Sequence, residues 1–405
     1  MHIVLVGARA EVIEELSGLD HVLTVLYTGP TGPTVDRYAD RVSYRGFIPG
    51  YDACELAWSV LLHLGVADQV DLVIPCHELA IVTAAFLNSV LGLPAKIGLQ
   101  TAMAGRDKAL QKSLWTRCGV PTARYVTLTN APRSLEELSA ELVGLSPPFV
   151  IKPPSLGGSR LVQACQTVAD VFTALKDNPD MRHAVVEERQ EGPEWHFDGI
   201  VVNGRIDHIM VSRYLAPLIE TKHGSTLRSV AFPAARNPDI YAEAKEFAQA
   251  AVNALSGRWG VFHLEVFGKP GGFTAGELAW RPAGVLLPLA AERTIGINLW
   301  AAHARVLAGE ELPPPVSVGD LTVGFVCLPL KAGATNGVTR ADIEALPGVC
   351  HVRMLREPGQ LMGEMRASTM GVAMVLIEGS DIEDCERLID EAVRLTMDLH
   401  EQKSG

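Results

Sequence analysis

The first hundred residues alternate short apolar runs with helical stretches, and no other feature of the sequence constrains the fold as strongly. The β-branched runs are at 2–7 and 70–75, and residues 51–64 and 79–91 have helical character. Strands that alternate with helices are typical of a parallel α/β sheet. We therefore expect an N-terminal α/β domain over residues 1–100.

The rest of the chain indicates a different, α+β organisation. Helical patterns are followed by pairs of apolar runs that are separated by turn residues, as in hairpins. We expect helices at 106–118, 134–143, 239–255 and 381–400, and strands at 124–128, 149–154, 184–188, 195–202, 205–212, 261–267, 273–279, 321–328 and 371–377. Three consecutive prolines at 313–315 form a linker, so a separate module is expected after them.

Composition excludes several classes of protein. The 405 residues suggest two to four domains, and a hydrophobic fraction of 48% excludes a disordered chain. Thirty-five basic against 47 acidic residues give a formal net charge of −12, which does not suit a nucleic-acid or membrane-surface protein. No apolar run reaches the roughly 18 to 20 residues of a membrane span. Seven scattered cysteines without a C-x-x-C pair indicate buried thiols, and we expect a cytoplasmic protein.

Common phosphate-binding and hydrolase motifs are missing, so any phosphate chemistry must be carried by other residues. Lys152 ends an apolar strand, where an unpaired ammonium would be costly, and we expect its charge to face an anion. Gly157 and Gly158 follow, and their backbone N–H groups could approach phosphate oxygens. The alternative is a plain hairpin turn with an exposed lysine.

The segment VVEERQEGPE at 185–194 runs from a strand into a turn. Its backbone groups and carboxylates could bind a base edge and ribose hydroxyls. The alternative is an acidic turn on the surface.

Glu265 and Glu277 lie in apolar strand contexts on either side of the turn at 269–272. A hairpin would place the two carboxylates side by side, and a cation such as Mg²⁺ would relieve their repulsion. Arg281 would reach the same site and suits a phosphate or a developing oxyanion. The alternative is that both carboxylates face solvent. His263, beside Glu265, is expected to be a hydrogen-bonded core histidine.

Taken in order, these residues resemble the ATP-grasp superfamily, and the resemblance covers nearly the whole chain. Residues 106–123 look like the Asp-Lys helix and Gly-x-Pro turn that begin the lid region of that family, and 185–194 resembles its adenine and ribose segment. The resemblance implies an ATP-grasp fold. It would have an N-terminal parallel α/β domain at 1–100, a central lid subdomain at 101–190, a C-terminal ATP-grasp subdomain with the metal site at 191–312, and an extra C-terminal α+β module at 316–405.

The resemblance also implies roles for individual residues. The lysines that match Lys108 and Lys152 contact ATP phosphates, and the family's metal carboxylates match Glu265 and Glu277, for Mg²⁺ or alternatively Mn²⁺. The nucleotide site would be completed by Gly157, Gly158 and Ser159 in the phosphate loop, by Glu187, Arg189 and Gln190 at adenine, and by Glu194 at ribose. One departure is that Ala279 stands where the family has an asparagine metal ligand, so a second metal would be held less tightly.

Within the superfamily, the sequence most resembles the L-amino-acid ligases, which join two amino acids. The segment IETKH at 219–223 has the Glu-x-x-His spacing of a substrate loop in that subgroup. This implies Glu220 for a substrate ammonium and His223 near the reacting carbonyl; the alternative is an ordinary polar loop. Val285, four residues after Arg281, could line the acyl pocket.

The sequence therefore predicts an ATP-dependent carboxylate–amine ligase that releases ADP and phosphate through an acyl phosphate. Small-molecule carboxylates and amines, both expected to be amino acids, would be its substrates, and a homodimer is compatible with the family. The alternatives are an ATP-grasp ligase or carboxylase with a non-amino-acid acceptor, and a non-catalytic nucleotide-binding protein.

Overall fold

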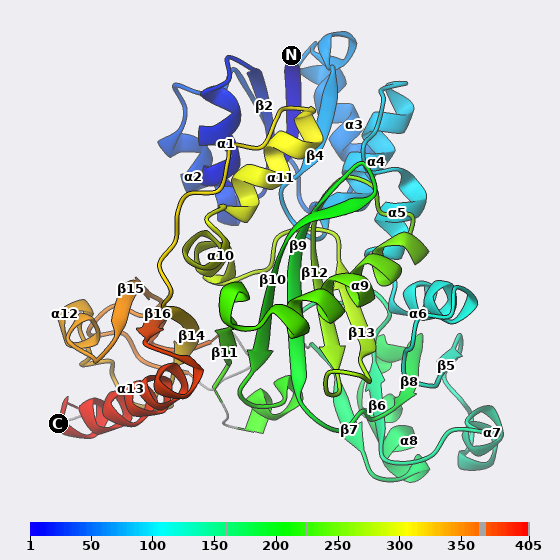
Figure 1. Cartoon of the computed structure of the whole chain (residues 1–405). Coiled ribbons are helices and arrows are strands. Elements are labelled where there is room, and N and C mark those ends of the chain that lie inside the picture. Colours follow the sequence, from blue (N-terminus) through cyan, green and yellow to red (C-terminus); the bar gives the residue numbers. More distant parts are fainter. Residues whose placement is uncertain (159, 224–225, 364–369, 404–405) are drawn as a thin grey trace.

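The computed structural model describes residues 1–158, 160–223, 226–363 and 370–403, and it contains three β-sheets flanked by helices (Figure 1). The first sheet is parallel and has the order β3-β2-β1-β4. Its strands are β1 (His2–Val6), β2 (Val22–Tyr27), β3 (Tyr44–Phe47) and β4 (Leu72–Pro75). The helices of this region are α1 (Ala10–Ser17), α2 (Gly32–Arg37), α3 (Cys54–His63), α4 (Ala80–Val90) and α5 (Leu99–Ala104), with the 3₁₀ turns η1 (Gly29–Thr31) and η2 (Ala67–Gln69).

A helix from much later in the chain completes this N-terminal layer. Figure 1 shows α11 (Leu299–Ala308) beside α1 and β4. The Nε2 atom of His303 on α11 is 3.2 Å from the carbonyl oxygen of Pro75 at the end of β4. The Nδ1 atom of the same ring is 3.3 Å from the backbone nitrogen of Val261. The same histidine therefore links the parallel sheet to the central sheet.

The second sheet is a small antiparallel sheet that lies below one end of the central sheet in Figure 1. Its order is β5-β8-β6-β7, from β5 (Tyr125–Leu128), β6 (Phe149–Lys152), β7 (Gln163–Cys165) and β8 (Ala184–Glu188). Helices α7 (Leu135–Glu141) and α8 (Val168–Asp177) and the turn η3 (Pro179–Met181) accompany it, and α6 (Lys108–Arg117) precedes it. Asp107 caps α6 by accepting hydrogen bonds from the backbone of Ala109 and Leu110.

The third sheet has eight antiparallel strands in the order β13-β12-β9-β10-β11-β14-β16-β15. The strands are β9 (Glu194–Val202), β10 (Arg205–Tyr214), β11 (Arg228–Ala231), β12 (Gly260–Phe267), β13 (Thr274–Ala279), β14 (Thr322–Leu328), β15 (Val349–Met354) and β16 (Ala373–Gly379). The accompanying helices are α9 (Pro238–Ala254), α10 (Leu287–Ile295), α12 (Arg340–Glu344) and α13 (Ile382–Lys403), with the turns η4 (Leu218–His223) and η5 (Ala234–Arg236).

The third sheet shows how the expected C-terminal module joins the rest of the chain. Residues 310–319 have no regular structure, as the prolines indicate, but the strand that follows them pairs with β11. Strands β14 to β16 therefore extend the central sheet, and α13 packs on β14 and β16. The physical reason for this pairing is that β11 would otherwise be an edge strand with unpaired backbone N–H and C=O groups. The domain boundaries themselves stay predictions.

The predicted fold class is confirmed, because a parallel α/β layer is followed by two antiparallel sheets with helices. The expected helices at 106–118 and 239–255 are found as α6 and α9, with ends shifted by one or two residues. No helix within the described residues is long and apolar enough to cross a bilayer. The cytoplasmic location and the homodimer stay predictions.

Candidate active site

A cavity of about 600 Å³ lies where the two antiparallel sheets and the carboxyl end of β4 meet. This volume is within the range of small-molecule sites. Eleven of the residues selected from the sequence line it: Lys108, Lys152, Gly157, Gly158, Glu187, Arg189, Gln190, Glu194, Glu265, Glu277 and Arg281. The fold thus brings together residues that are separated by up to 173 positions in the chain.

At one end of the cavity, Glu187 on β8 is buried between two lysines. Its Oε1 is 2.7 Å from Lys152 Nζ, and its Oε2 is 2.7 Å from Lys112 Nζ. Burial alone would raise the Glu187 pKa, but the two ammonium groups outweigh burial and lower the pKa to about 2. Lys152 does face an anion, as expected, and is only 7% exposed, so the alternative of an exposed hairpin lysine is wrong.

Lys112 was not selected from the sequence, although it completes this ion-pair group. It lies one turn along α6 from Lys108 and also donates to Thr122 Oγ1 at 3.0 Å. Burial is the largest influence on Lys112 and lowers its pKa, whereas Glu187 and Glu277 raise the Lys152 pKa against the effect of burial. The sequence signal that could have identified Lys112 is its i, i+4 spacing from Lys108, which places both lysines on the same face of α6.

Lys108 connects the phosphate loop to the predicted metal carboxylates. Its Nζ lies 2.9 Å from Glu277 Oε1 and donates to the Leu156 carbonyl at 2.7 Å. The side chain is buried at the start of α6. Lys108 therefore lies next to both Gly157 and the carboxylate pair.

The β12–β13 hairpin places Glu265 directly opposite Glu277, as the sequence predicted. Both carboxylates line the cavity, so the alternative in which they face solvent is wrong. Carboxylate oxygens close to Lys108 and Lys152 suit Mg²⁺ that is shared with nucleotide phosphates, so this donor set fits the metal that the resemblance implies. Ala279, at the position of the missing asparagine, pairs with His263 across the hairpin.

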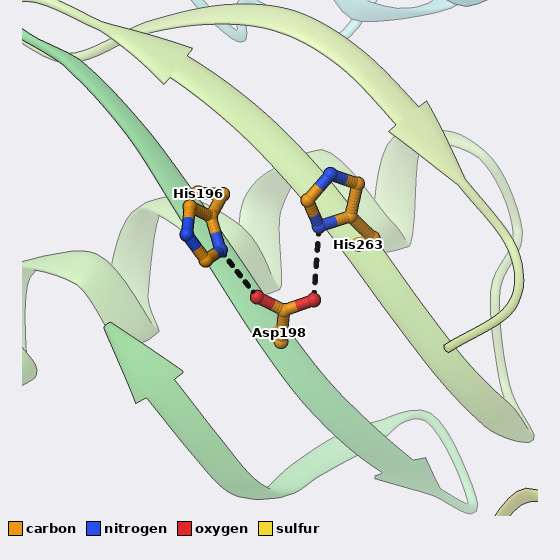
Figure 2. A group of neighbouring side chains, drawn as sticks. All are labelled: His196, Asp198 and His263. Atoms are coloured by element: carbon orange, nitrogen blue, oxygen red, sulfur yellow. Dashed lines mark hydrogen bonds and ion pairs between the residues drawn. The ribbon is translucent and has the colours of Figure 1, made fainter. Parts of the chain in front are cut away.

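In the strand next to this hairpin, β9, Asp198 holds two histidines (Figure 2). Its Oδ2 is 2.6 Å from His196 Nδ1, and its Oδ1 is 2.9 Å from His263 Nδ1. Burial lowers the pKa of His263, but Asp198 outweighs it and raises that pKa to about 10, while burial lowers the pKa of His196. His263 is thus hydrogen-bonded as expected. In addition, its Nε2 lies 3.9 Å from Glu265 Oε1, so it also belongs to the cavity wall.

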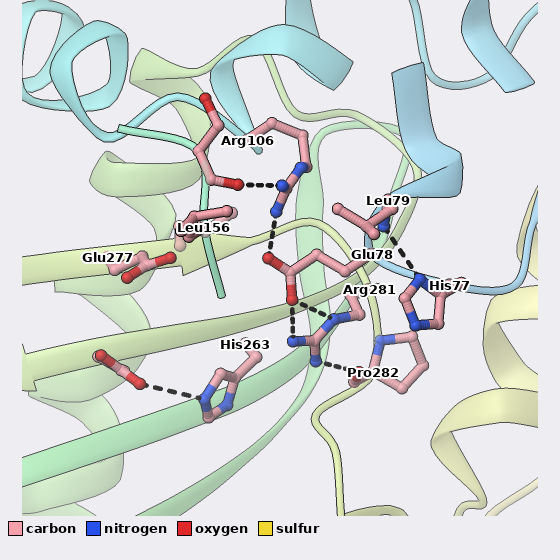
Figure 3. A network of polar contacts seen from close by, with 12 residues as sticks. His77, Glu78, Leu79, Arg106, Leu156, His263, Glu277, Arg281 and Pro282 are labelled. Carbon is pink, nitrogen blue, oxygen red and sulfur yellow. Dashed lines mark hydrogen bonds and ion pairs between the residues drawn. The ribbon is translucent and has the colours of Figure 1, made fainter. Parts of the chain in front are cut away.

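Arg281 is held by a carboxylate from the N-terminal layer (Figure 3). Glu78 follows β4, and its Oε2 accepts from Arg281 Nε at 3.2 Å and from Arg281 Nη2 at 2.5 Å. Its other oxygen pairs with Arg106, which also donates to the Ser155 carbonyl. Burial would raise the Glu78 pKa, but Arg281 and Arg106 lower it to about 2.

Glu78 was also not selected from the sequence. It lies just beyond the carboxyl end of a parallel strand, and that edge of an α/β sheet is where ligands bind. This position was the signal that could have found it.

Glu194, at the start of β9, is buried at the same cavity. Its Oε2 accepts a hydrogen bond from the Leu218 backbone at 2.9 Å. Burial and the nearby Glu265 raise the Glu194 pKa to about 8. Glu187 and Glu194 are buried, whereas Glu191 and Gly192 in the turn between them are exposed, so the alternative of a surface turn holds only for the middle of this segment.

Of the other selected residues, one is described but does not line the cavity, and two cannot be placed from the described structure. The Glu220 side chain is 51% exposed and lies 3.9 Å from Arg189 Nη2, rather than in the cavity lining. His223 ends η4, but its side chain lies outside the described part of the structure, as does Ser159 altogether. The roles of these three residues stay predictions. Val285 does line the cavity.

Comparisons with known proteins identify an ATP-grasp domain in this chain. A family model for the ATP-grasp domain matches residues 113–284. The L-arginine-specific L-amino acid ligase of Bacillus subtilis is 25% identical over 354 residues, which cover 84% of this chain and 83% of that protein. A formate-dependent phosphoribosylglycinamide formyltransferase of Nitratidesulfovibrio vulgaris is 25% identical over 303 residues, 65% of this chain and 70% of the relative.

Solved structures extend the similarity to nearly the whole chain. An L-amino acid ligase from Bacillus licheniformis superposes with a TM-score of 0.75 at 19% identity, over 98% of this chain and 97% of that one. The ADP complex of an N5-carboxyaminoimidazole ribonucleotide synthetase gives a TM-score of 0.71 at 18% identity, over 99% and 98% of the two chains. The expected ATP-grasp fold is therefore confirmed.

Proposed function

We propose that this chain, which contains an ATP-grasp domain, is an ADP-forming ligase that joins the carboxylate of one amino acid to the amine of another. ATP would be consumed, and ADP and phosphate released. The observation that carries this proposal is the opposed pair Glu265 and Glu277, with Lys108 and Arg281 at the same cavity.

The charges of the cavity suit phosphoryl transfer from ATP to a carboxylate. Negative charge is spread over the transferring group in such a reaction, and catalysis depends mainly on positioning and electrostatic stabilisation. Lys108 and Lys152 would bind the phosphates, and Glu265 and Glu277 would hold Mg²⁺, which supplies further positive charge when bound. Glu187 keeps Lys152 charged and fixed, because its carboxylate lies 2.7 Å from the ammonium.

The proposed reaction has two steps, and each step forms one bond and breaks another. A substrate carboxylate oxygen attacks the γ-phosphorus and ADP leaves, which gives an acyl phosphate. The amine nitrogen then attacks the acyl carbon, and phosphate leaves with the oxygen that came from the carboxylate. Arg281 would stabilise the oxyanion that forms on the acyl oxygen, because its guanidinium is oriented by Glu78.

An acyl phosphate hydrolyses readily, so water must be kept out while it exists. The loop after β6 carries Gly157 and Gly158 along the cavity and is tied by Arg106 and Lys108 through the carbonyls of residues 155 and 156. We propose that this loop and the β5–β8 sheet form the lid over the phosphates.

The test is ADP release with Mg²⁺ and ATP, in which amino acids are supplied singly and in pairs and products are identified by mass spectrometry. The expected result is ADP formation with particular pairs, together with a product whose mass is that of the two amino acids minus water. If no amino-acid mixture releases ADP although the protein binds ATP, a non-catalytic nucleotide-binding protein would be favoured instead.

A second candidate is a ligase with a non-amino-acid substrate, because a formate-dependent relative also matches the sequence. Formate-dependent or bicarbonate-dependent ADP release, in the absence of amino acids, would favour this candidate. Neither compound is expected to stimulate ADP release if amino acids are the substrates.

A further inference from the structure

The cavity has a second end whose chemistry differs from that of the nucleotide end. It is formed by five residues that we call the apolar wall: Tyr214, Leu227, Val285, Leu287 and Phe325. They come from the end of β10, the segment before β11, the segment after Arg281, the start of α10, and β14. The wall is thus assembled from the central sheet, its C-terminal extension and one helix.

The apolar wall is continuous with a buried core. Tyr214, Leu227, Leu287 and Phe325 belong to one hydrophobic cluster, and Val285 packs against it. Phe325 is 2% exposed and is paired with Leu376 on the neighbouring strand β16, in the same hydrophobic cluster. Strands that follow the proline linker therefore supply both a lining residue and the packing behind it.

The wall begins where the proposed chemistry takes place. Arg281 is followed along the chain by Gly284, Val285 and Leu287, all of which line the cavity. The Tyr214 ring lies 4.7 Å, centroid to centroid, from the ring of His196, which is hydrogen-bonded to Asp198, and Arg281 is near enough to act on the Tyr214 pKa. A group attached to the α-carbon of a carboxylate beside Arg281 would therefore reach this wall.

Val285 adds a second observation at this point. It has a backbone φ of 57°, which a β-branched residue rarely adopts. Such strain persists only where the surrounding structure holds it, and it is concentrated at ligand sites. Here it holds a valine at the cavity surface, four residues after Arg281.

Within the described lining, no member of the apolar wall carries a charge, and every cationic side chain has an acidic partner. The pairs are Lys108 with Glu277, Lys152 with Glu187, Arg189 with Glu220, Arg281 with Glu78, and His263 with Asp198. A negatively charged substrate group against the wall would be buried without a free cation to pair with, which is costly, and a positively charged one would lie against uncharged side chains of the wall. A sugar phosphate would likewise find no cation there.

We propose that the amino acid whose carboxylate lies beside Arg281 has an apolar side chain, and that this side chain packs against the apolar wall. This inference rests on the ligase function proposed above and assigns its substrate class. It also gives the C-terminal extension of the sheet a role, because Phe325 takes part in substrate selection.

The first test compares kcat/KM for ADP release across amino acids at this position, with the partner amino acid held constant. Leucine, methionine and phenylalanine are expected to exceed arginine, lysine and aspartate by about tenfold or more, since hydrophobic pockets discriminate on this scale. A preference for a charged amino acid would overturn the inference while leaving the ligase function intact. If no amino-acid pair gives ADP at all, the ligase proposal itself fails.

Variants then assign the preference to the wall. Phe325→Ala should lower kcat/KM for the large apolar amino acids about tenfold and leave the KM for ATP unchanged. Val326→Ala is the matched control, because Val326 is buried on the same strand in a different hydrophobic cluster and does not line the cavity; it should leave the ratio between substrates unchanged. Equal loss of selectivity in both variants would contradict a direct role for Phe325.

A variant that gains a new substrate preference is a useful further test, because truncation of a buried side chain such as Phe325 can impair folding. Val285 is only partly buried, so Val285→Asp can be accommodated more easily than a charge at Phe325. It should raise kcat/KM for lysine and arginine relative to leucine by about tenfold, because the new carboxylate would pair with the substrate cation. If the ratio of kcat/KM between these amino acids is unchanged in a variant that still binds ATP, the substrate side chain does not lie against Val285.

Discussion

The two ends of the cavity are stabilised in different ways. At the nucleotide end, charged residues are buried in pairs, as with Glu187 between Lys112 and Lys152. At the other end, Tyr214, Leu287 and Phe325 form an uncharged surface that is continuous with the core. The charged end contains groups suited to a reaction that uses ATP, and the apolar end is suited to choosing a substrate.

This difference also separates the parts of the chain that supply each end. The charged groups come mainly from residues 108–281, which nearly coincide with the matched ATP-grasp domain. Phe325 comes from beyond that domain. Changes at the charged end should therefore affect catalysis or stability with every substrate, whereas changes in the apolar wall should alter the choice among substrates.

The largest effect is expected for Arg281→Ala. Removal of a group that stabilises a developing oxyanion costs about 10²- to 10³-fold in kcat, and the loss should be the same for every amino-acid pair. Coupled ADP release measures it. Arg293→Ala is the control, since this arginine pairs with Glu378 outside the cavity and should retain full activity. An Arg281→Ala protein with normal turnover would remove the proposed catalytic role.

The next effect concerns stability at the charged end. Lys112→Met leaves Glu187 with one lysine instead of two, and loss of one partner from a buried ion pair costs about 3–5 kcal/mol of unfolding free energy. Urea denaturation measures the change. The exposed Arg394→Ala, which breaks a surface pair with Asp398, should cost less than about 1 kcal/mol. Similar losses in the two variants would mean that burial does not distinguish these ion pairs.

A smaller effect should appear in the pH dependence of stability. The Glu194 pKa is raised from 4.5 to about 8, so between these values the folded protein binds a proton that the unfolded chain has lost. The contribution of Glu194 is therefore complete below about pH 4.5 and is lost as the pH rises through about 8.

Denaturation of the wild type and of Glu194→Gln between pH 5 and 9 isolates this contribution. The free energy of unfolding should fall with rising pH more steeply in the wild type than in the variant. Parallel curves would show that Glu194 is not protonated in the folded protein at neutral pH.

The smallest effect is expected for Glu220→Gln. Because this carboxylate is half exposed and its pair with Arg189 is long, its loss should leave the unfolding free energy within about 1 kcal/mol of the wild type. If Glu220 binds a substrate ammonium, the KM for one amino acid should nevertheless rise about tenfold, with the KM for ATP unchanged. If the KM values for the amino acid and for ATP are both unchanged, Glu220 is an ordinary loop residue.

The sequence was most informative where neighbouring residues act together. Glu265, Glu277 and Arg281 lie in one hairpin and the residues after it, so local strand geometry was enough to place them at one site. Glu78 could not be found in this way, because its partner Arg281 is 203 residues away and only tertiary structure brings them together. Lys112 was missed because a lysine on a helix is usually exposed.

The apolar end was harder to predict for the same physical reason. Tyr214, Leu287 and Phe325 are ordinary core-forming residues, and nothing in their local sequence separates a cavity wall from a buried core. The role of β14 depended on its pairing with β11, whereas the prolines before it suggested a separate module.

The most direct test of the account is isotope transfer from an amino acid whose carboxylate is labelled with ¹⁸O. During turnover with ATP and a partner amino acid, an acyl phosphate would deliver one carboxylate oxygen to the released phosphate. The account predicts one ¹⁸O atom in each phosphate, in a one-to-one ratio to the dipeptide formed. Unlabelled phosphate alongside ADP, or release of AMP and pyrophosphate, would contradict it.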